Sequence, residues 1–467
     1  WGFRQLQGWA YSNHSLFRLT GSFFNPGPYS GYLAITLPVA LGILLEQSKR
    51  NMPYYLSMGC IGTAIVVLPA GMSRSAWIAV VVSCAWVYAL YRLDRKQAAT
   101  RLRQHKRWYI IGGILGGILL LGGSASLYTL KKDSADGRFL MWKITTKAIQ
   151  KQPITGTSLG GFPAAYAETQ AEYMASGKAT EQEKLVAGCP EYAFNEYLQI
   201  GLEQGLVGLA LFIGWLGLLF YKGIKNKRYA CCGGLMSLAI FAFSSYPLQL
   251  PEFWVVLIFL GVMSVTPDKD EIRENQAESN GHRWGKQIFF MGIAILGIGL
   301  FWMQKDHYKA YQQWNKAQMF YNNKAYEAAL EVYEPLYPLL KHKPEFLFEA
   351  AQSLSKTGQY EKANEYLERA VLLSSDPMLY YVMAKNEQCL GEYRQAEKHL
   401  LHAIDILPER IYPYYLLMNL YTEPSYFQPA KLKMAIDSVL TKKPKVESSA
   451  IKEMKEKARS MLNNTSI

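Results

Sequence analysis

The sequence is poor in cysteine, and its few cysteines form no framework. Six occur in 467 residues, and four of them lie within apolar runs. Only Cys189 and Cys389 lie in polar segments, where a bridge between them would be possible. No two cysteines are spaced as CxxC, so metal and redox centres of that type have little support.

The chain also lacks an initiating methionine and a signal sequence, since its first residue is Trp1. We expect further membrane segments to precede this sequence.

Residues 29–303 carry long apolar runs, whereas 304–467 are polar, highly charged and rich in tyrosine. The net charge of +13 could indicate a nucleic-acid partner. The positive residues cluster instead in short loops between apolar runs, which is the pattern of a membrane protein. Eight runs are long enough to cross about 30 Å of hydrocarbon as helices. They lie near 29–45, 54–72, 74–91, 109–130, 196–221, 229–247, 250–266 and 286–303.

The lysines and arginines orient these spans. Loops 46–53, 92–108 and 222–228 are the basic ones, and they fall on one side if every run crosses once. That side is predicted to be the cytoplasm, together with the linker 267–285. The opposite, periplasmic side then receives residues 1–28, the turn at Arg74, the loop 131–195, the turn 246–252 and the tail 304–467.

The tail repeats with a period near 34. Tyr326, Tyr360, Tyr393 and Phe427 are separated by 34, 33 and 34 positions, and an alanine follows each by three residues. A second alanine occurs nine residues before each of the three tyrosines. This period is typical of tetratricopeptide (TPR) repeats, so 307–440 resembles a TPR domain of about four units with a degenerate, capping last unit.

The aromatic residues of this repeat are expected to pack between helices, with an acceptor or partner groove as the alternative. They are Tyr366, Tyr380, Tyr381, Tyr414 and Tyr415. No residue of the repeat has the pattern of a catalytic group.

Three polar clusters interrupt the apolar half on its predicted periplasmic side. They are the Asn25-Pro26 segment, Ser73-Arg74-Ser75-Ala76-Trp77, and a long set that runs from Gly137-Arg138 and Trp142 through the Pro153 to Phe162 loop to Asn195-Glu196-Tyr197-Leu198-Gln199 and Glu203-Gln204-Gly205. With these pieces, residues 20–265 resemble the O-antigen ligase-related superfamily. That superfamily includes O-antigen ligases, O-antigen polymerases and bacterial protein O-oligosaccharyltransferases.

The resemblance implies an all-α fold, a polytopic transmembrane bundle of GT-C-like topology followed by a soluble TPR domain. The predicted parts are a periplasmic segment 1–28, a ligase-like membrane domain 29–266 with its loop 131–195, a cytoplasmic linker 267–285, a last span 286–303 and the periplasmic tail 304–467. The implied location is the inner membrane of a bacterium. The implied donor is a glycan on undecaprenyl pyrophosphate, with no metal and no other cofactor.

Basic residues on the periplasmic side suit that donor independently. An arginine at the edge of hydrocarbon is costly, so Arg74 and Arg138 are predicted to grip the pyrophosphate, with snorkelling to the interface as the alternative. Lys143 and Lys147 share a helix face near Arg138 and are predicted to assist. Lys131, Lys132 and Lys151 surround them. The DxD-like run Asp268-Lys269-Asp270 lies in the cytoplasmic linker and is interpreted as a solvated charge run.

The chain departs from the family pattern at Phe194. Ligases of this family usually carry a histidine immediately before the asparagine that corresponds to Asn195, and a phenyl ring cannot accept a proton. Glu196 is the first candidate for the base, although a carboxylate is also favoured there by the helix macrodipole. The other candidates are His14, His307, Glu191 and Glu203. Asn25, Asn195 and Glu203 are predicted to orient donor or acceptor.

The predicted function is therefore transfer of a lipid-linked glycan to an acceptor hydroxyl on the periplasmic face. The acceptor could be lipid A core in lipopolysaccharide biosynthesis, another repeat unit, or a protein. The TPR tail slightly favours a protein acceptor or partner. The rival from another class is a non-catalytic scaffold, which Phe194 favours, and a transporter is the weaker rival because the sequence has no inverted repeat.

Overall fold

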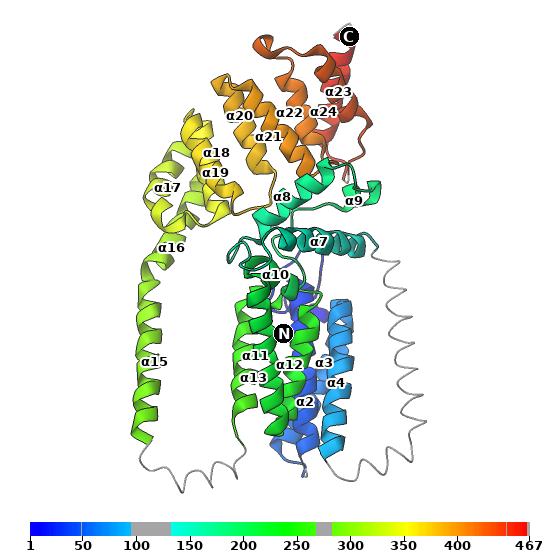
Figure 1. Ribbon diagram of the computed structural model, residues 1–467, viewed down its shortest axis with the longest axis vertical. Helices are drawn as coiled ribbons and strands as arrows, with labels where there is room; N and C mark the ends of the chain where they lie inside the picture. Colours follow the sequence, from blue (N-terminus) through cyan, green and yellow to red (C-terminus); the bar gives the residue numbers. More distant parts are fainter. Residues whose placement is uncertain (48, 95–131, 268–282, 445, 465–467) are drawn as a thin grey trace. The chain divides into compact units, whose positions relative to one another are not determined.

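The computed structural model describes residues 1–47, 49–94, 132–267, 283–444 and 446–464 (Figure 1). Within these residues every regular element is a helix, which confirms the all-α prediction. The chain divides into two compact units. The first comprises 1–135, 153–156 and 192–280, and the second comprises 136–152, 157–191 and 281–467. The predicted span 109–130, most of loop 92–108 and the run Asp268-Lys269-Asp270 lie outside the described residues.

The first unit is a bundle around α12. Its helices are α1 (Gly2–Leu6), α2 (Pro26–Glu46), α3 (Met52–Val67), η1 (Leu68–Gly71), α4 (Arg74–Asp94), α10 (Glu196–Glu203), α11 (Gly205–Lys225), α12 (Tyr229–Ala242), η2 (Pro247–Gln249) and α13 (Pro251–Val265). Helix α12 packs against α2, α4 and α13. Its approach to α2 depends on glycine, because a Cβ at Gly42 would lie 2.5 Å from Cα of Ala230.

Five described helices are long and apolar enough to cross a membrane. They are Pro26–Glu46, Met52–Gly71, Arg74–Asp94, Gly205–Lys225 and Ile288–Asn322. The apolar helices α12 and α13 are shorter. Several of the predicted spans are thus helices capable of crossing a membrane. The run 196–221 is divided into the separate helices α10 and α11.

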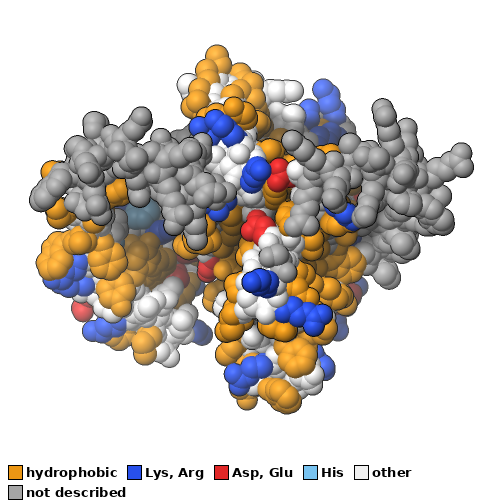
Figure 2. Space-filling view, turned by 90° about the horizontal axis from the view of Figure 1, so that it is seen from below, with side chains coloured by type: hydrophobic (Ala, Val, Ile, Leu, Met, Phe, Trp, Pro, Cys, Tyr) orange, Lys and Arg blue, Asp and Glu red, His pale blue; other side chains and the backbone are white. Residues whose placement is uncertain are grey.

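Basic side chains gather at one end of the first unit, where α4 and α11 end and α12 begins. Lys222, Lys225 and Lys227 are exposed there, and Lys227 forms an ion pair with Asp94 at 3.4 Å. Figure 2 looks toward this end and shows blue basic side chains among orange hydrophobic ones. Arg74 begins α4 at its opposite end, Asn25 immediately precedes α2, and Asn195 immediately precedes α10.

The second unit contains α7 (Lys132–Lys151), most of which belongs to it, and the helical tail. The remaining helices are α8 (Phe162–Ala175), α9 (Glu181–Val186), α15 (Arg283–Met303), α16 (Lys305–Asn322), α17 (Tyr326–Leu340), α18 (Pro344–Lys356), α19 (Tyr360–Val371), α20 (Met378–Leu390), α21 (Tyr393–Ile406), α22 (Ile411–Leu420), η3 (Pro424–Tyr426), α23 (Pro429–Thr441) and α24 (Ser449–Asn464). The apolar side chains of α15 from Ile288 onward are exposed, as a lipid-facing helix requires.

The repeat alanines are buried between paired helices. Tyr326, Tyr360 and Tyr393 each begin the second helix of a pair. The alanines at both repeat positions are at most 2 % exposed, and they are Ala317, Ala329, Ala351, Ala363, Ala384 and Ala396. The fourth unit departs from the pattern, because Phe427 precedes α23 and is 51 % exposed. The TPR-like architecture is therefore confirmed, with a divergent last unit.

Residues 157–191, which make up most of the segment between α7 and α10, are part of the second unit and contact the repeat. Helix α8 packs against α21. The amide Nε2 of the fully buried Gln170 donates to the carbonyl oxygens of Ile406 at 2.8 Å and Gly188 at 3.0 Å. Ser375 Oγ donates to the carbonyl oxygen of Pro190. The six cysteines, including Cys189 and Cys389, are free thiols.

Candidate functional site

Arg74 begins α4 after a tight turn. Met72 takes the left-handed conformation with φ 47°, and Trp77 Nε1 donates to the carbonyl oxygen of Leu68 at 3.2 Å across the turn. The hydroxyl oxygens of Ser73 and Ser75 lie 3.3 Å apart on either side of the arginine. Arg74 is half-buried, and in the described part of the chain it has no ion pair or hydrogen bond. Its charge is therefore available to an anion.

An apolar cleft of about 420 Å³ adjoins the residue after Arg74. Its lining comes from α4, α10 and the end of α12, and consists of Ser75, Ile78, Tyr197, Ala239, Ile240, Phe243 and Ser244. The Tyr197 hydroxyl donates to the carbonyl oxygen of Ala239 at 2.9 Å, so the polar atom of this lining residue is already satisfied by the backbone. A cation beside an apolar cleft is a complementary surface for an anionic amphiphile.

The Asn25 cluster meets the same turn. Asn25 is exposed and caps α2, since its side-chain oxygen accepts from Gly27 N at 3.0 Å. The start of α2 packs against η1, because a Cβ at Gly71 would lie 2.0 Å from Ser30 Oγ. The structure thus brings the first two motif clusters together at one end of the bundle.

Asn195 and Glu196 form the start of α10. Asn195 is buried and caps the helix by accepting from the backbone N–H groups of Tyr197 and Leu198, both at 3.1 Å. Glu196 is only 1 % exposed, with Oε1 accepting from Leu248 N at 2.6 Å and Oε2 from Gln249 Nε2 at 3.0 Å. These bonds tie α10 to η2.

The Glu196 carboxyl lies outside the spanning helices, and its ionisation is shifted. Burial raises its pKa from 4.5 to about 7, and the nearby charge of Glu203 acts in the same direction. The hydrogen bonds from Gln249 and Leu248 oppose the shift without cancelling it. A carboxyl that titrates near neutral pH has the property expected of a general base.

Phe194 does not act as a hydrogen-bonding group in place of the family histidine. Its φ is +49°, and its ring lies edge-on to Tyr246 at a centroid distance of 4.9 Å. The Tyr192 ring stacks on the same Tyr246 ring at a centroid distance of 5.3 Å. The position is therefore filled by an aromatic contact between the α10 segment and the α12–η2 connection.

Gln199 is a polar residue of this motif that the sequence did not single out for a role. Its Oε1 accepts from Ala193 N at 2.8 Å, and its Nε2 donates to Glu203 Oε1 at 3.0 Å. Gln199 and Glu203 are both buried. A neutral amide carries no charge signal in the sequence, although it connects two residues of the candidate site.

Gly205 divides the predicted span 196–221. Its φ is +68°, and a Cβ there would lie 2.0 Å from the carbonyl oxygen of Ile154. Leu206 N donates to the carbonyl oxygen of Pro153 at 2.8 Å. The Pro153–Gly156 loop and the Glu203–Gly205 segment, two motifs far apart in sequence, therefore lie against each other.

The remaining predicted site residues belong to the second unit. Arg138, Lys143 and Lys147 are on α7, and Lys143 and Lys147 share a face, with their Nζ atoms 4.6 and 5.4 Å from the Tyr173 ring centroid. Lys143 Nζ lies 2.6 Å from Glu183 Oε1. The hydrogen bond to Glu183 is the main cause that raises the pKa of Lys143.

Lys151 likewise pairs with Glu172 at 2.6 Å. Part of the predicted basic cluster is therefore neutralised by the chain itself, and the binding roles of Arg138, Lys143 and Lys147 stay predictions. The side chains of Lys131 and Lys132 are outside the described residues.

The candidate bases His14 and His307 lie in different units. His14 is in the first unit, where its Nδ1 accepts from Leu16 N at 3.0 Å, and His307 is in the second unit beside His342. Over the ranges that the structure describes, no three His, Cys, Asp or Glu residues are arranged to hold a metal ion.

Comparisons with known proteins agree with both parts of the chain. The family model described as O-antigen ligase matches residues 59–213. A second model, described as anaphase-promoting complex, cyclosome, subunit 3, matches 322–403 within the repeat. None of the curated proteins compared with the chain matches it. The first match includes Arg74 and the α10 motif, while Asn25 precedes it.

The membrane part of this chain is thus matched to the O-antigen ligase family, as its motifs predicted, and it is followed by a TPR-like region, which supports a membrane glycosyl-transferring function of the ligase or polymerase type.

Proposed function

We propose that the chain transfers a glycan from a polyprenyl pyrophosphate, undecaprenyl pyrophosphate by family resemblance, to an acceptor hydroxyl. The observation that carries the proposal is the half-buried Arg74, which has no ion-pair partner in the described residues. The next residue, Ser75, lines an apolar cleft. A lipid-linked pyrophosphate combines an anionic head with a long apolar tail. Arg74 is proposed to bind the head, and the cleft is proposed to receive the first part of the tail.

The chemical step needs a stabilised leaving group. The acceptor oxygen bonds to the anomeric carbon, the bond from that carbon to the pyrophosphate oxygen breaks, and the lipid pyrophosphate leaves. A guanidinium offers a fork of N–H donors to the departing oxygens. Stabilising charge that develops in the transition state is usually the largest contribution to such a reaction.

The acceptor proton needs a base, and Glu196 is proposed for it. Its pKa near 7 leaves a large fraction ionised at neutral pH. Because both carboxylate oxygens bond to η2 at Leu248 and Gln249, the proposal requires η2 to move when acceptor binds. Asn195 would act by holding the start of α10, and Glu203 through its bond to Gln199.

The direct test is transfer by the purified full chain in lipid vesicles. The donor would be undecaprenyl pyrophosphate bearing a fluorescent oligosaccharide, and the acceptors, in parallel, would be lipid A core, a second donor molecule and a periplasmic protein extract. Release of undecaprenyl pyrophosphate with glycan on any one acceptor is the expected result. No release with any acceptor would contradict the proposal, and the acceptor that reacts separates ligase, polymerase and protein-glycosylating activity.

The membrane sidedness is a proposal as well. Single cysteines placed in 222–228 should react with a membrane-impermeant maleimide only after the cells are opened, whereas cysteines in 320–440 should react in intact spheroplasts. The physical reason is the basic end of the bundle, where Lys222, Lys225 and Lys227 are exposed. Protection of the TPR-like region in spheroplasts would reverse the topology and with it the periplasmic site.

A non-catalytic scaffold is the second candidate, and Phe194 favours it. Its aromatic contact with Tyr246 fills the place of the family histidine with a side chain that cannot move a proton. The scaffold predicts that substitutions at Phe194 or Glu196 leave every surface glycan unchanged, while deletion of 304–467 alters glycan assembly. Loss of glycan transfer in a Glu196 variant that keeps its fold would exclude this role.

A further inference from the structure

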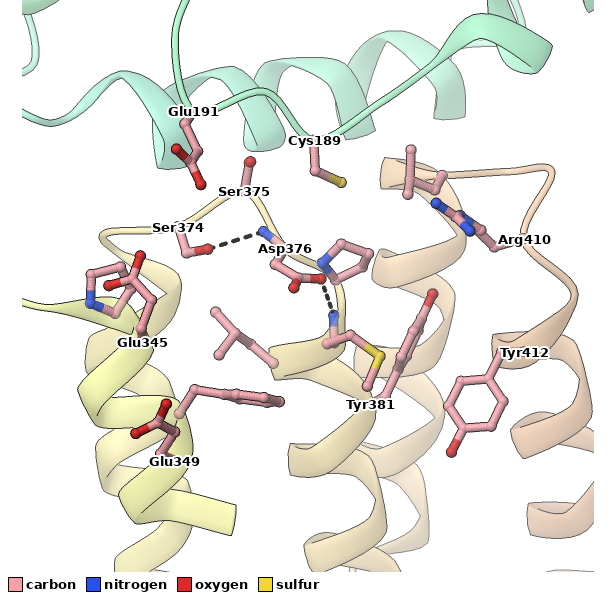
Figure 3. A pocket seen from close by; sticks show the side chains of 16 residues that line it. Cys189, Glu191, Glu345, Glu349, Ser374, Ser375, Asp376, Tyr381, Arg410 and Tyr412 are labelled. Atoms are coloured by element: carbon pink, nitrogen blue, oxygen red, sulfur yellow. Dashed lines mark hydrogen bonds between the residues drawn. The ribbon is translucent and has the colours of Figure 1, made fainter. Parts of the chain in front are cut away.

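The second unit contains a cavity of about 980 Å³ that has no part in the proposed transfer step (Figure 3). It lies between the segment after α9 and the N-terminal ends of α18, α20 and α22. Its wall includes Cys189, Glu191, Glu345, Phe348, Tyr381 and Arg410. A volume of this size lies at the upper end of the range for small-ligand sites, so it can hold a short peptide segment but not a folded domain.

Tyr381 contributes a buried hydroxyl to the wall of this cavity. The side chain is 4 % exposed, and its hydroxyl has no hydrogen-bond partner among the described residues. A buried hydroxyl without a partner is unfavourable, and native proteins rarely leave one. The hydroxyl lies at the end of the cavity toward Arg410 (Figure 3). A ligand that carries a backbone carbonyl or amide would satisfy it.

The charges of the wall are unequal. Four carboxyl residues line the cavity, namely Glu191, Glu345, Glu349 and Asp376, against the single cation Arg410. Glu349 accepts from Trp314 and Tyr333, and Asp376 accepts from Met378 N. In the described part of the chain, no ion pair involves Glu191 or Glu345. The acidic end is therefore open to a cation, although the chain as a whole carries +13.

We propose that this cavity binds an extended polypeptide segment that carries a lysine or arginine. The basic side chain would lie at Glu191 and Glu345, with its methylene stem against Phe348. The peptide backbone would accept from Arg410 and bond to the Tyr381 hydroxyl. A pyrophosphate-linked glycan is excluded by the same carboxylates, because its charge has the same sign. The proposal does not depend on glycan transfer.

The test uses the full chain in detergent micelles without donor lipid. The probe is a fluorescent, end-blocked peptide of alternating alanine and lysine, compared with peptides in which glutamate or glutamine replaces lysine. The lysine peptide should bind most tightly, and its affinity should fall as salt rises. The double variant Glu191→Gln/Glu345→Gln should weaken it about tenfold or more. Equal binding of the glutamate peptide, or unchanged binding by the double variant, would overturn the proposal.

Tyr381→Phe separates a ligand contact from a packing role. Because the hydroxyl is unpartnered, the variant should melt at the same temperature as the parent or higher, yet bind the lysine peptide about 2- to 10-fold more weakly. The matched control is Tyr421→Phe, whose hydroxyl donates to Glu397 at 2.7 Å outside the cavity. That variant should melt lower and bind the peptide normally. Unchanged peptide binding by Tyr381→Phe, or displacement of the peptide by free oligosaccharide, would count against the peptide site.

Discussion

The two compact units differ in how many of their charged side chains form ion pairs. Of the ion pairs in the described residues, Lys227–Asp94 alone lies in the first unit, at its basic end. In the second unit, even exposed lysines such as Lys143 and Lys151 have carboxylate partners at 2.6 Å. At the motif end of the membrane bundle, Arg74 and Glu196 have none in the described residues.

The uncompensated charges of the first unit are the better candidates for binding a ligand. An ionisable residue at the membrane without a counter-ion is costly and is by default a functional hypothesis. A surface lysine that is paired within its own unit has less charge to offer a substrate. The lack of a counter-ion therefore favours Arg74 and Glu196 over the lysines of α7, although all of them lie in polar clusters of the sequence.

The largest effect is expected at Glu196. Glu196→Gln keeps the shape of the side chain but removes the basic oxygen, so the transfer rate should fall by about 10²–10⁴-fold. With a pKa near 7, the ionised fraction rises through neutral pH, and the parent rate should increase from pH 6 to pH 8 and then level. The variant should lose this rise. Initial rates in vesicles across this pH range measure both effects.

The pH dependence of folding stability provides an independent test of the raised pKa of Glu196. A pKa raised by burial means that the folded state favours the protonated form, so this contribution is full below about pH 4.5 and is lost as pH rises through 7. The melting temperature of Glu196→Gln should therefore depend less on pH over this range. The exposed Glu252→Gln is the matched control and should change neither rate nor melting. A parental rate and pH profile in Glu196→Gln would move the search to His14 and His307.

Arg74 should give the next largest effect. Arg74→Ala removes the guanidinium from the proposed leaving group and should lower the transfer rate by about 10²–10³-fold. Arg74→Lys should recover little of it, because a point charge cannot reproduce the paired donors of the fork. Transfer is expected to be unchanged by a chelator.

Arg92→Ala is the control within the same helix, since Arg92 lies at the opposite end of α4 and donates to Tyr88. It should transfer normally. Parental activity in Arg74→Lys would reduce Arg74 to an interface anchor and remove the contrast between the two units.

Much of the architecture could be predicted from the sequence. The tail was predictable because Ala351, Ala363 and the equivalent alanines recur at fixed positions, and a close helix contact tolerates few other residues there. The meeting of the Asn25 and Arg74 clusters followed from the span count, since consecutive spans return a chain to the same side. Hydropathy could not predict the break at Gly205, because one glycine barely changes a window average.

The remaining features depend on contacts between distant residues. Nothing local indicates that Gln170 bonds to Ile406, or that Lys143 meets Glu183 rather than a substrate. The individual roles of Gln199 and Tyr381 could not be predicted for a related reason, since a neutral polar side chain is informative only when its burial and partners are known. Periodicity predicts helices and their faces, whereas charge compensation requires the folded chain.

The smallest effect on transfer is expected at Lys143. This variant tests directly whether a lysine with a partner in its own unit is dispensable for substrate binding. Burial alone would raise the pKa of Glu183, but hydrogen bonds, chiefly from Lys143, hold it down at about 2. The stability this provides is present above about pH 4.5 and is lost as pH falls toward 2. In Lys143→Ala the loss should be smaller and should end at a higher pH, because the pKa of Glu183 in the folded state is less depressed. At pH 7 the free energy of unfolding should change by about 1 kcal/mol or less. Transfer should change by about twofold or less, since an exposed, already paired ammonium has little charge left to give. A loss of transfer as large as that of Arg74→Ala, measured in the same vesicles, would show that the pairing with Glu183 is exchanged for substrate and that charge compensation does not mark the site.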